Sequence, residues 1–253
     1  MKRDPLFLTL LESANTNFSG WDFSFISETV RMKSEPLSWS YGSIAFLLMQ
    51  RAKSMLDMGT GGGEFLSMLQ PFPSTIYATE GYAPNVPIAR KKLEPLGVTV
   101  VEVINDTVLP FQDGQFDFII NQHESYAASE VKRILSPHGV FLTQQVGGLD
   151  CAVLNEQFGS PLNSEFASWS LEAACSELEE NGFTILDAKE EFPFQRFYDI
   201  GAIVYYLKAI PWQIPDFTVE RYYKELYRIH EIILQKGYFD VKQHRFIIKA
   251  IRD

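Results

Sequence analysis

A glycine-rich turn that follows a short apolar run restricts the fold of this chain more than any other feature. The run at residues 54–58 predicts a buried strand, and Gly59, Gly61 and Gly63 follow before an expected helix at residues 64–69. Glycine tolerates the positive φ of a tight turn, and its missing side chain lets a ligand approach the backbone. The pattern therefore indicates a cofactor site at the carboxyl end of the first strand of a doubly wound sheet.

Short apolar runs continue to alternate with amphipathic stretches beyond this turn. This alternation predicts an α/β fold with a mostly parallel sheet and helices on both faces. The runs are rich in Val, Ile and Phe, as strands buried on both sides are. The expected strands are residues 54–58, 75–79, 98–104, 116–121, 140–146, 183–192 and 245–251, and the expected helices between them are residues 64–69, 86–93, 127–135 and 171–180.

Changes in sequence texture divide the chain into four expected parts. We expect an N-terminal helical extension or cap at residues 1–52 and the cofactor-binding α/β core at residues 53–192. Residues 193–240 predict a helical insertion, and residues 241–253 contain the final strand of the core sheet. The helices expected outside the core are residues 38–50, 198–210 and 218–236.

Composition narrows the range of partners. The 253 residues carry 32 acidic and 22 basic side chains, a net charge of −10, which repels the backbone of a nucleic acid unless a basic patch compensates. The apolar runs fall far short of the roughly 18 residues that span a bilayer, and we find no export signal, so we expect a cytoplasmic protein without membrane contact. Two cysteines and four histidines form no cluster with metal-ligand spacing, so no metal is expected.

Two acidic residues flank the turn and argue against a diphosphate ligand. A dinucleotide turn has the pattern Gly-x-Gly-x-x-Gly, with helix amides that receive the pyrophosphate. Here Glu64 occupies the position of the third glycine, and Asp57 lies two residues before the first. Carboxylates suit a ligand with a positive ammonium and no phosphate. S-adenosylmethionine (SAM), which carries an ammonium and a sulfonium, fits these charges.

Four segments in sequence order together resemble the class I SAM-dependent methyltransferases, and most closely the methyltransferase-11 type of domain. Residues 56–63 match the first motif of that family, residues 79–81 the second, residues 105–117 the third region, and residues 130–139 the helix and turn before the fifth strand. His138 replaces the first glycine of the usual Pro-Gly-Gly in that turn. The resemblance covers about residues 53–192. It implies a Rossmann-like sheet of seven strands whose last strand inserts antiparallel beside the fifth.

The resemblance also implies which residues bind SAM. The carboxylate of Glu80 would accept hydrogen bonds from both ribose hydroxyls, since it offers two acceptor oxygens to a vicinal diol. The acid after the third strand, Asp106, would accept from the adenine amino group. The expected cofactor-binding residues are Asp57, Gly59, Thr60, Gly61, Gly63, Glu80, Gly81, Asp106, Thr107 and Asn121.

Methyl transfer needs an aligned and deprotonated acceptor rather than a strong acid or a metal. The segment after the fourth strand should lie beside the methyl group, and His123 in that segment is the candidate general base. The alternative is that His123 packs against adenine or satisfies the loop. The segment lacks the two prolines of enzymes that methylate exocyclic amines of bases. The candidate substrate-binding residues are Trp39, Tyr41, Glu124, Tyr126, Tyr198 and Trp212.

The function expected from these features is methyl transfer from SAM to a small-molecule acceptor. Two alternatives stay open: an RNA or protein methyltransferase, and a SAM-binding protein without catalysis. The insertion at residues 193–240 is expected to be a lid that excludes water, with a dimer surface or a helical brace as the competing interpretation. The sequence leaves the acceptor atom and the choice between monomer and homodimer open.

Overall fold

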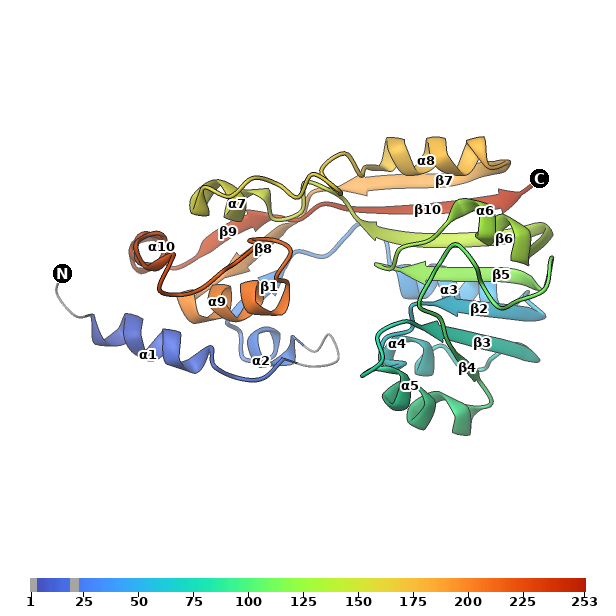
Figure 1. Cartoon of the computed structure of the whole chain (residues 1–253), viewed down its shortest axis with the longest axis horizontal. Helices are drawn as coiled ribbons and strands as arrows, with labels where there is room; N and C mark the ends of the chain where they lie inside the picture. Colours follow the sequence, from blue (N-terminus) through green and yellow to red (C-terminus); the bar gives the residue numbers. More distant parts are fainter. Residues whose placement is uncertain (1–3, 19–22) are drawn as a thin grey trace. The chain divides into compact units, whose positions relative to one another are not determined.

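The computed structural model describes residues 4–18 and 23–253 of the chain (Figure 1). The chain divides into two compact units, and neither is a continuous stretch of sequence. The first unit takes residues up to 37, 147–168 and 191–244, and the second takes residues 38–146, 169–190 and 245–253. Each unit has its own hydrophobic core. In the described ranges, no helix combines the length and the apolar character needed to cross a membrane.

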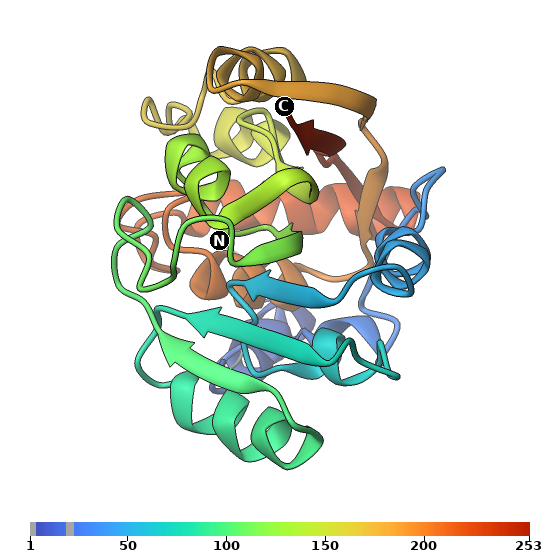
Figure 2. The ribbon, with the colours of Figure 1, turned by 90° about the vertical axis from the view of Figure 1, so that its right-hand side faces the viewer.

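The second unit is built on a seven-stranded sheet in the order β4-β3-β2-β5-β6-β10-β7 (Figure 2). The pairs β2–β3, β2–β5, β3–β4 and β5–β6 are parallel, and β10 runs antiparallel to β6. The predicted fold class, a doubly wound and mostly parallel sheet, is therefore confirmed. The strands are β2 (Ser54–Met58), β3 (Thr75–Glu80), β4 (Thr99–Glu102), β5 (Phe116–Gln122), β6 (Leu135–Val146), β7 (Phe183–Glu191) and β10 (Arg245–Arg252).

Apolar side chains on both faces explain why these short runs form the centre of the sheet. In β2 the last four residues are buried, and in β5 Phe116, Phe118, Ile119 and Ile120 are buried. Among the helices that cover the sheet, α3 packs beside β5, α5 beside β4, α6 beside β6 and α8 beside β10. The helices of this unit are α3 (Tyr41–Met49), α4 (Glu64–Ser67), α5 (Val86–Leu93), the 3₁₀ turn η1 (Glu94–Leu96), α6 (Ala128–Ile134) and α8 (Leu171–Glu180).

The strand β6 begins earlier than the sequence predicts. Leu135 was expected to end a helix and residues 136–139 to form a turn, yet Leu135 already pairs with Phe116 of β5, and the register shifts before Phe118 pairs with Val140. His138 adopts a positive φ of 61° in this stretch, the left-handed conformation that the usual glycine favours. Because of this register shift, the chain can turn between Leu135 and Val140 while both residues pair with β5.

The first unit contains a separate three-stranded sheet, which the sequence does not predict. Its order is β1-β8-β9 with antiparallel pairing, and its core includes α9, of which nine of ten residues are buried. Residues 193–240 are thus not entirely helical, because two short strands with alternating burial flank the helices. The elements are α1 (Pro5–Ser13), α2 (Ser24–Ser27), β1 (Met32–Ser34), α7 (Ala152–Phe158), β8 (Phe194–Phe197), α9 (Ile200–Ala209), α10 (Tyr223–Lys236) and β9 (Phe239–Lys242).

Candidate functional site

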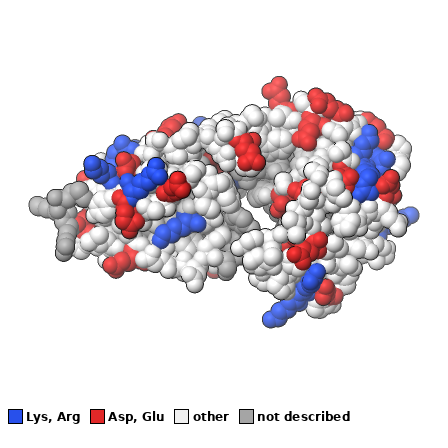
Figure 3. Space-filling view, viewed as in Figure 1, with Lys and Arg blue, Asp and Glu red and all other residues white. Residues whose placement is uncertain are grey.

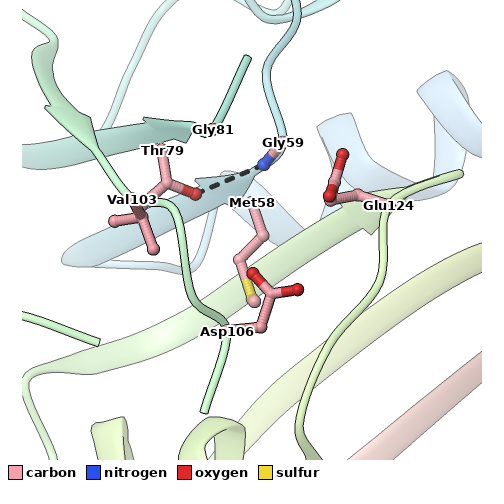
Figure 4. Close-up of a pocket in the computed structure, with 7 residues that line it drawn as sticks. All are labelled: Met58, Gly59, Thr79, Gly81, Val103, Asp106 and Glu124. Carbon is pink, nitrogen blue, oxygen red and sulfur yellow. Dashed lines mark hydrogen bonds between the residues drawn. The ribbon is translucent and has the colours of Figure 1, made fainter. Parts of the chain in front are cut away.

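The glycine turn leaves β2 and is held by the neighbouring strand β3. The amide of Gly59 donates to Thr79 Oγ1 at 3.3 Å, and the amide of Thr60 donates to the Thr79 carbonyl at 2.8 Å (Figure 4). Gly59, Gly61 and Gly63 have φ values of 70°, 62° and 81°. A residue with a side chain is strained at such angles, so the turn requires glycine as the sequence predicts.

Two of the predicted glycine positions are explained by packing rather than by a ligand. A Cβ atom at Gly81 would lie 2.6 Å from the backbone oxygen of Val103, so the chain beyond β3 passes directly against the end of β4. A Cβ atom at Gly63 would lie 2.7 Å from the side chain of Leu93 in α5. A Cβ atom at Gly61, in contrast, would meet no atom within 4 Å. Of these three, Gly61 is the position with open space beside the turn.

Two buried carboxylates stand at the ends of adjacent strands, as predicted. Asp57 in β2 is 4% exposed and Glu80 at the end of β3 is 6% exposed. One oxygen of Glu80 accepts a hydrogen bond from the Tyr82 amide at 2.7 Å. Burial raises the pKa of Asp57 to about 7, the nearby Thr60 hydroxyl opposes this shift, and the charge of Glu80 adds to it.

Asp106 and Glu124 bring two further carboxylates to a hollow beside the glycine turn. The hollow is lined by Met58, Gly59, Thr79, Gly81, Val103, Asp106 and Glu124 (Figure 4). Asp106 accepts a hydrogen bond from the Ser125 hydroxyl. Burial and the charges of Asp106 and Glu80 raise the pKa of Glu124 to about 7. Among the described residues, none of the four carboxylates forms an ion pair.

The side chain of Glu124 fills the space over Gly59. A Cβ atom at Gly59 would lie 2.4 Å from Glu124 Cγ and 2.8 Å from Glu124 Oε2. The free volume of the hollow is about 10 Å³, room for roughly one water molecule. A ligand the size of SAM therefore needs the Glu124 side chain to move before it can lie across the turn.

Two buried hydroxyl groups near Asp57 bear on whether the residues at the glycine turn suit a cationic ligand. Tyr41 OH, at the start of α3, and Thr60 Oγ1 are both buried without a well-formed hydrogen bond. Burial and the charge of Asp57 raise the pKa of Tyr41. Acceptor oxygens that lack partners, around carboxylates that lack cations, suit an ammonium with its three N–H donors. This set of acceptor oxygens fits the ammonium of SAM, and the hollow has room for SAM only after the Glu124 side chain moves.

A buried polar network supports the end of β5. Asn121 is fully buried, and its Oδ1 accepts from Thr143 Oγ1 at 2.9 Å and from Gln145 Nε2 at 2.6 Å. Gln145 Nε2 also donates to the carbonyl of Glu124 at 3.0 Å, which anchors the loop that carries this carboxylate. Asn121 thus supports the loop, while Gln145 was not predicted. Its signal was present as a polar run, residues 143–145, within a strand expected to be buried on both faces.

His123 lies in the same loop, where Gln144 connects it to Trp39. The indole Nε1 of Trp39 donates to Gln144 Oε1 at 2.8 Å, and Gln144 Nε2 lies 3.1 Å from His123 Nε2. Desolvation of the ring and the positive charge of Arg245 lower the pKa of His123 to about 3, although His123 as a whole is an exposed residue. The ring is therefore neutral at pH 7.

Four other predicted residues do not line the hollow, and two of them belong to the first unit. Thr107 is exposed, and its amide and hydroxyl both donate to Asn105 Oδ1. Tyr126 packs edge-on against Phe141 and near Trp169 in the core of the second unit. Tyr198 precedes α9 and Trp212 follows it, so both belong to the first unit, where Trp212 is 47% exposed.

Comparisons with known proteins find methyltransferases among the relatives of this chain. Residues 56–143 match the family described as a methyltransferase domain. A demethylmenaquinone methyltransferase of Thermus thermophilus is 31% identical over 113 residues, which cover 41% of this chain and 51% of that protein. The chain thus spans about half the length of this relative.

Solved structures confirm the fold at low identity. A Bacillus halodurans protein described as a methyltransferase matches with a TM-score of 0.57 and 19% identity over 83% of this chain and 99% of its own. A geranyl diphosphate methyltransferase determined in complex with SAM matches with a TM-score of 0.50 and 14% identity over 84% of each chain. Residues 56–143, which run from β2 through the glycine turn into β6, therefore match a methyltransferase-domain family, and the solved structures share the fold of the chain.

Proposed function

We propose that the second unit holds SAM at the glycine turn and that the chain transfers a methyl group to a small-molecule acceptor. The observation that carries this proposal is the set of four carboxylates without a cationic partner in the described residues, gathered at a turn that requires glycine. Such a site attracts a cation and repels a diphosphate. A nicotinamide dinucleotide is therefore a poor fit.

Each polar group has a part in holding the cofactor. Asp57 would bind the ammonium, with Thr60 Oγ1 and Tyr41 OH as further acceptors. Glu80 would accept from the ribose hydroxyls and Asp106 from the adenine amino group, as the family motifs imply. When bound, SAM supplies a methyl carbon on a sulfonium leaving group, so the protein mainly has to align the acceptor.

Entry of the cofactor requires a rotation of the Glu124 side chain. The atoms that would meet a group on Gly59 belong to a flexible side chain and not to the backbone, so side-chain rotation away from the turn clears the space. The carboxylate then stays on the same anchored loop, because its backbone carbonyl is held by Gln145. A cation in the site lowers the pKa of Glu124, since an opposite charge favours the ionised form.

A small-molecule acceptor is favoured over nucleic acid by the charge of the chain. On the face drawn in Figure 3, acidic side chains are interspersed with basic ones, and the described residues of that face form no continuous basic strip. The Thermus thermophilus relative is named for a demethylmenaquinone acceptor. Phenols and quinols are accordingly the first class of acceptor to screen.

Calorimetry with SAM and S-adenosylhomocysteine tests the cofactor site. Glu80→Gln removes a charge-assisted hydrogen bond, so it should weaken the binding free energy of both ligands by about 1–3 kcal/mol. Glu102→Gln is the matched control, because Glu102 pairs with Glu80 on the neighbouring strand but is exposed, and it should leave the affinity unchanged. Absence of binding to the wild type would refute the proposal. Binding without methyl transfer to any acceptor in labelled-methyl screens would indicate the competing function, a SAM-binding protein without catalysis.

A further inference from the structure

The hydrogen bonds around His123 fix which of its two nitrogens carries a proton. Trp39 Nε1 can only donate, so the group of Gln144 that faces it at 2.8 Å must be the amide oxygen. The amide nitrogen of Gln144 then faces His123 Nε2 at 3.1 Å and donates to it. A neutral imidazole that accepts at Nε2 carries its proton on Nδ1.

Two of the three residues in this chain of hydrogen bonds are buried, and His123 itself is exposed. Trp39 is 8% exposed and Gln144 is 5% exposed. The backbone of His123 adopts a positive φ of 59°, unusual for a residue other than glycine, and its amide donates to the Gln144 carbonyl at 2.8 Å. The imidazole is therefore held at both its backbone and its ring. Strained, over-determined positions of this kind gather at functional sites.

We propose that Gln144 is a positioning residue that holds His123 as a neutral Nδ1–H donor, and that His123 binds an uncharged oxygen of the methyl acceptor instead of removing its proton. The substrate part of this inference rests on the proposed function. The lone pair of Nε2, which a general base would need, is already engaged by Gln144. Nδ1 has no hydrogen-bond partner in the described residues, so it is the nitrogen free to contact a ligand.

The chemistry of the surroundings selects the class of acceptor group. A neutral N–H donor binds an oxygen acceptor, and the carboxylate of the next residue, Glu124, disfavours an anionic one. A carbonyl or ether oxygen next to the methylated atom satisfies both conditions. Among the described residues, the charge of Arg245 in β10 acts on the ring and also disfavours a protonated imidazole.

Nitrogen-15 NMR of histidine-labelled full-length protein tests the tautomer without any ligand. The His123 resonances are assigned by their loss in His123→Gln. In the wild type at pH 7 we expect a proton on Nδ1, a bare Nε2, and no titration midpoint between pH 5 and pH 8. A ring protonated at Nε2, or a midpoint in that range, would overturn the inference.

Substitutions of Gln144 and of its partner Trp39 test whether the Gln144 side chain determines the tautomer of His123. In Gln144→Glu, a carboxylate accepts from both Trp39 and His123, so the proton should move to Nε2 and the midpoint should rise by about two pH units or more. Gln122→Glu is the matched control, because Gln122 pairs with Gln144 across β5 and β6 and receives the same charge change. Trp39→Phe, which keeps the buried ring, should release the amide and give a mixture of tautomers. An unchanged ring in both Gln144→Glu and Trp39→Phe, or an equal response in Gln122→Glu, would contradict the role of Gln144.

Steady-state kinetics of methyl transfer distinguishes a hydrogen-bond donor role of His123 from a general-base role. With an acceptor found in the screen, His123→Gln keeps a donor and should raise KM while reducing kcat by less than about tenfold. Loss of a general base would reduce kcat by about 10²–10⁴-fold. A chain that transfers no methyl group would refute the proposed function and leave the NMR result standing. A His123 that titrates near neutrality in an active enzyme would refute this inference alone.

Discussion

Asp57→Asn should stabilise the ligand-free protein while weakening cofactor binding. The pKa of Asp57 is raised from 3.8 to about 7, a shift of roughly three units at 1.36 kcal/mol each. For an acid with a raised pKa, the favourable contribution to stability is present below the unfolded value and is lost as the pH rises through the folded value. Ionising the buried carboxyl therefore costs about 4 kcal/mol above pH 7, a cost that asparagine avoids.

Ionisation of Asp57 lowers the stability of the ligand-free protein but raises its affinity for the cofactor. The ammonium of the ligand favours ionised Asp57, so affinity should rise with pH until the carboxyl is fully ionised. With a pKa of about 7, roughly one molecule in 100 is ionised at pH 5 and half at pH 7, so S-adenosylhomocysteine should bind about 50-fold more tightly at pH 7 than at pH 5. Asp57→Asn should abolish this slope and weaken binding at pH 7 by about 1–3 kcal/mol.

Scanning calorimetry and titration calorimetry between pH 4 and pH 8 measure both effects. We expect Asp57→Asn to unfold at a higher temperature than the wild type at pH 8 and at a similar temperature at pH 4. The exposed Glu102→Gln again serves as the control. Glu124→Gln identifies any part of the binding slope that comes from the second carboxyl with a pKa of about 7. The reasoning is refuted if Asp57→Asn is no more stable at pH 8, or if its binding retains the wild-type slope.

Two further substitutions test the space around the turn. Glu124→Ala removes the side chain that lies over Gly59, so S-adenosylhomocysteine should associate several-fold faster in stopped-flow measurements; an unchanged rate would show that this side chain does not control entry. Gly81→Ala places a Cβ atom 2.6 Å from the Val103 carbonyl and should cost about 1–3 kcal/mol in urea unfolding, whereas Gly61→Ala meets no neighbour and should cost only the strain of its positive φ. Equal losses in the two variants would contradict the packing role of Gly81.

Local pattern predicted the parts of the structure that depend on local chemistry. The bounds of β2 and α5 match the sequence expectation because apolar spacing and the glycine turn mark them directly. Asp57 lies near the end of β2, where the apolar run predicted it, whereas Glu80 at the end of β3 was named from its resemblance to a family motif. Gly81 was predicted as a cofactor contact from its motif, yet its position is explained by the backbone of a strand more than 20 residues away.

Contacts between distant parts of the chain could not be predicted in this way. The hydrogen bond from Trp39 to Gln144 joins residues 105 positions apart, and that from Gln144 to His123 depends on the register of β5 against β6. The packing of Glu124 over Gly59 likewise follows from how the loop after β5 is anchored. Register and loop anchoring are tertiary properties, so no single segment of sequence records them.

The interleaved division of the chain affects how the protein can be made and dissected. The backbone passes from one unit to the other five times, at residues 37/38, 146/147, 168/169, 190/191 and 244/245. Cutting out any contiguous half would therefore remove strands from both sheets. During synthesis, the core of the first unit cannot form until segments separated by more than 100 residues have all been made. This separation favours slow folding and an intermediate with exposed apolar surface. Refolding yield should accordingly depend on chaperones and on protein concentration more steeply than it would for two domains joined end to end.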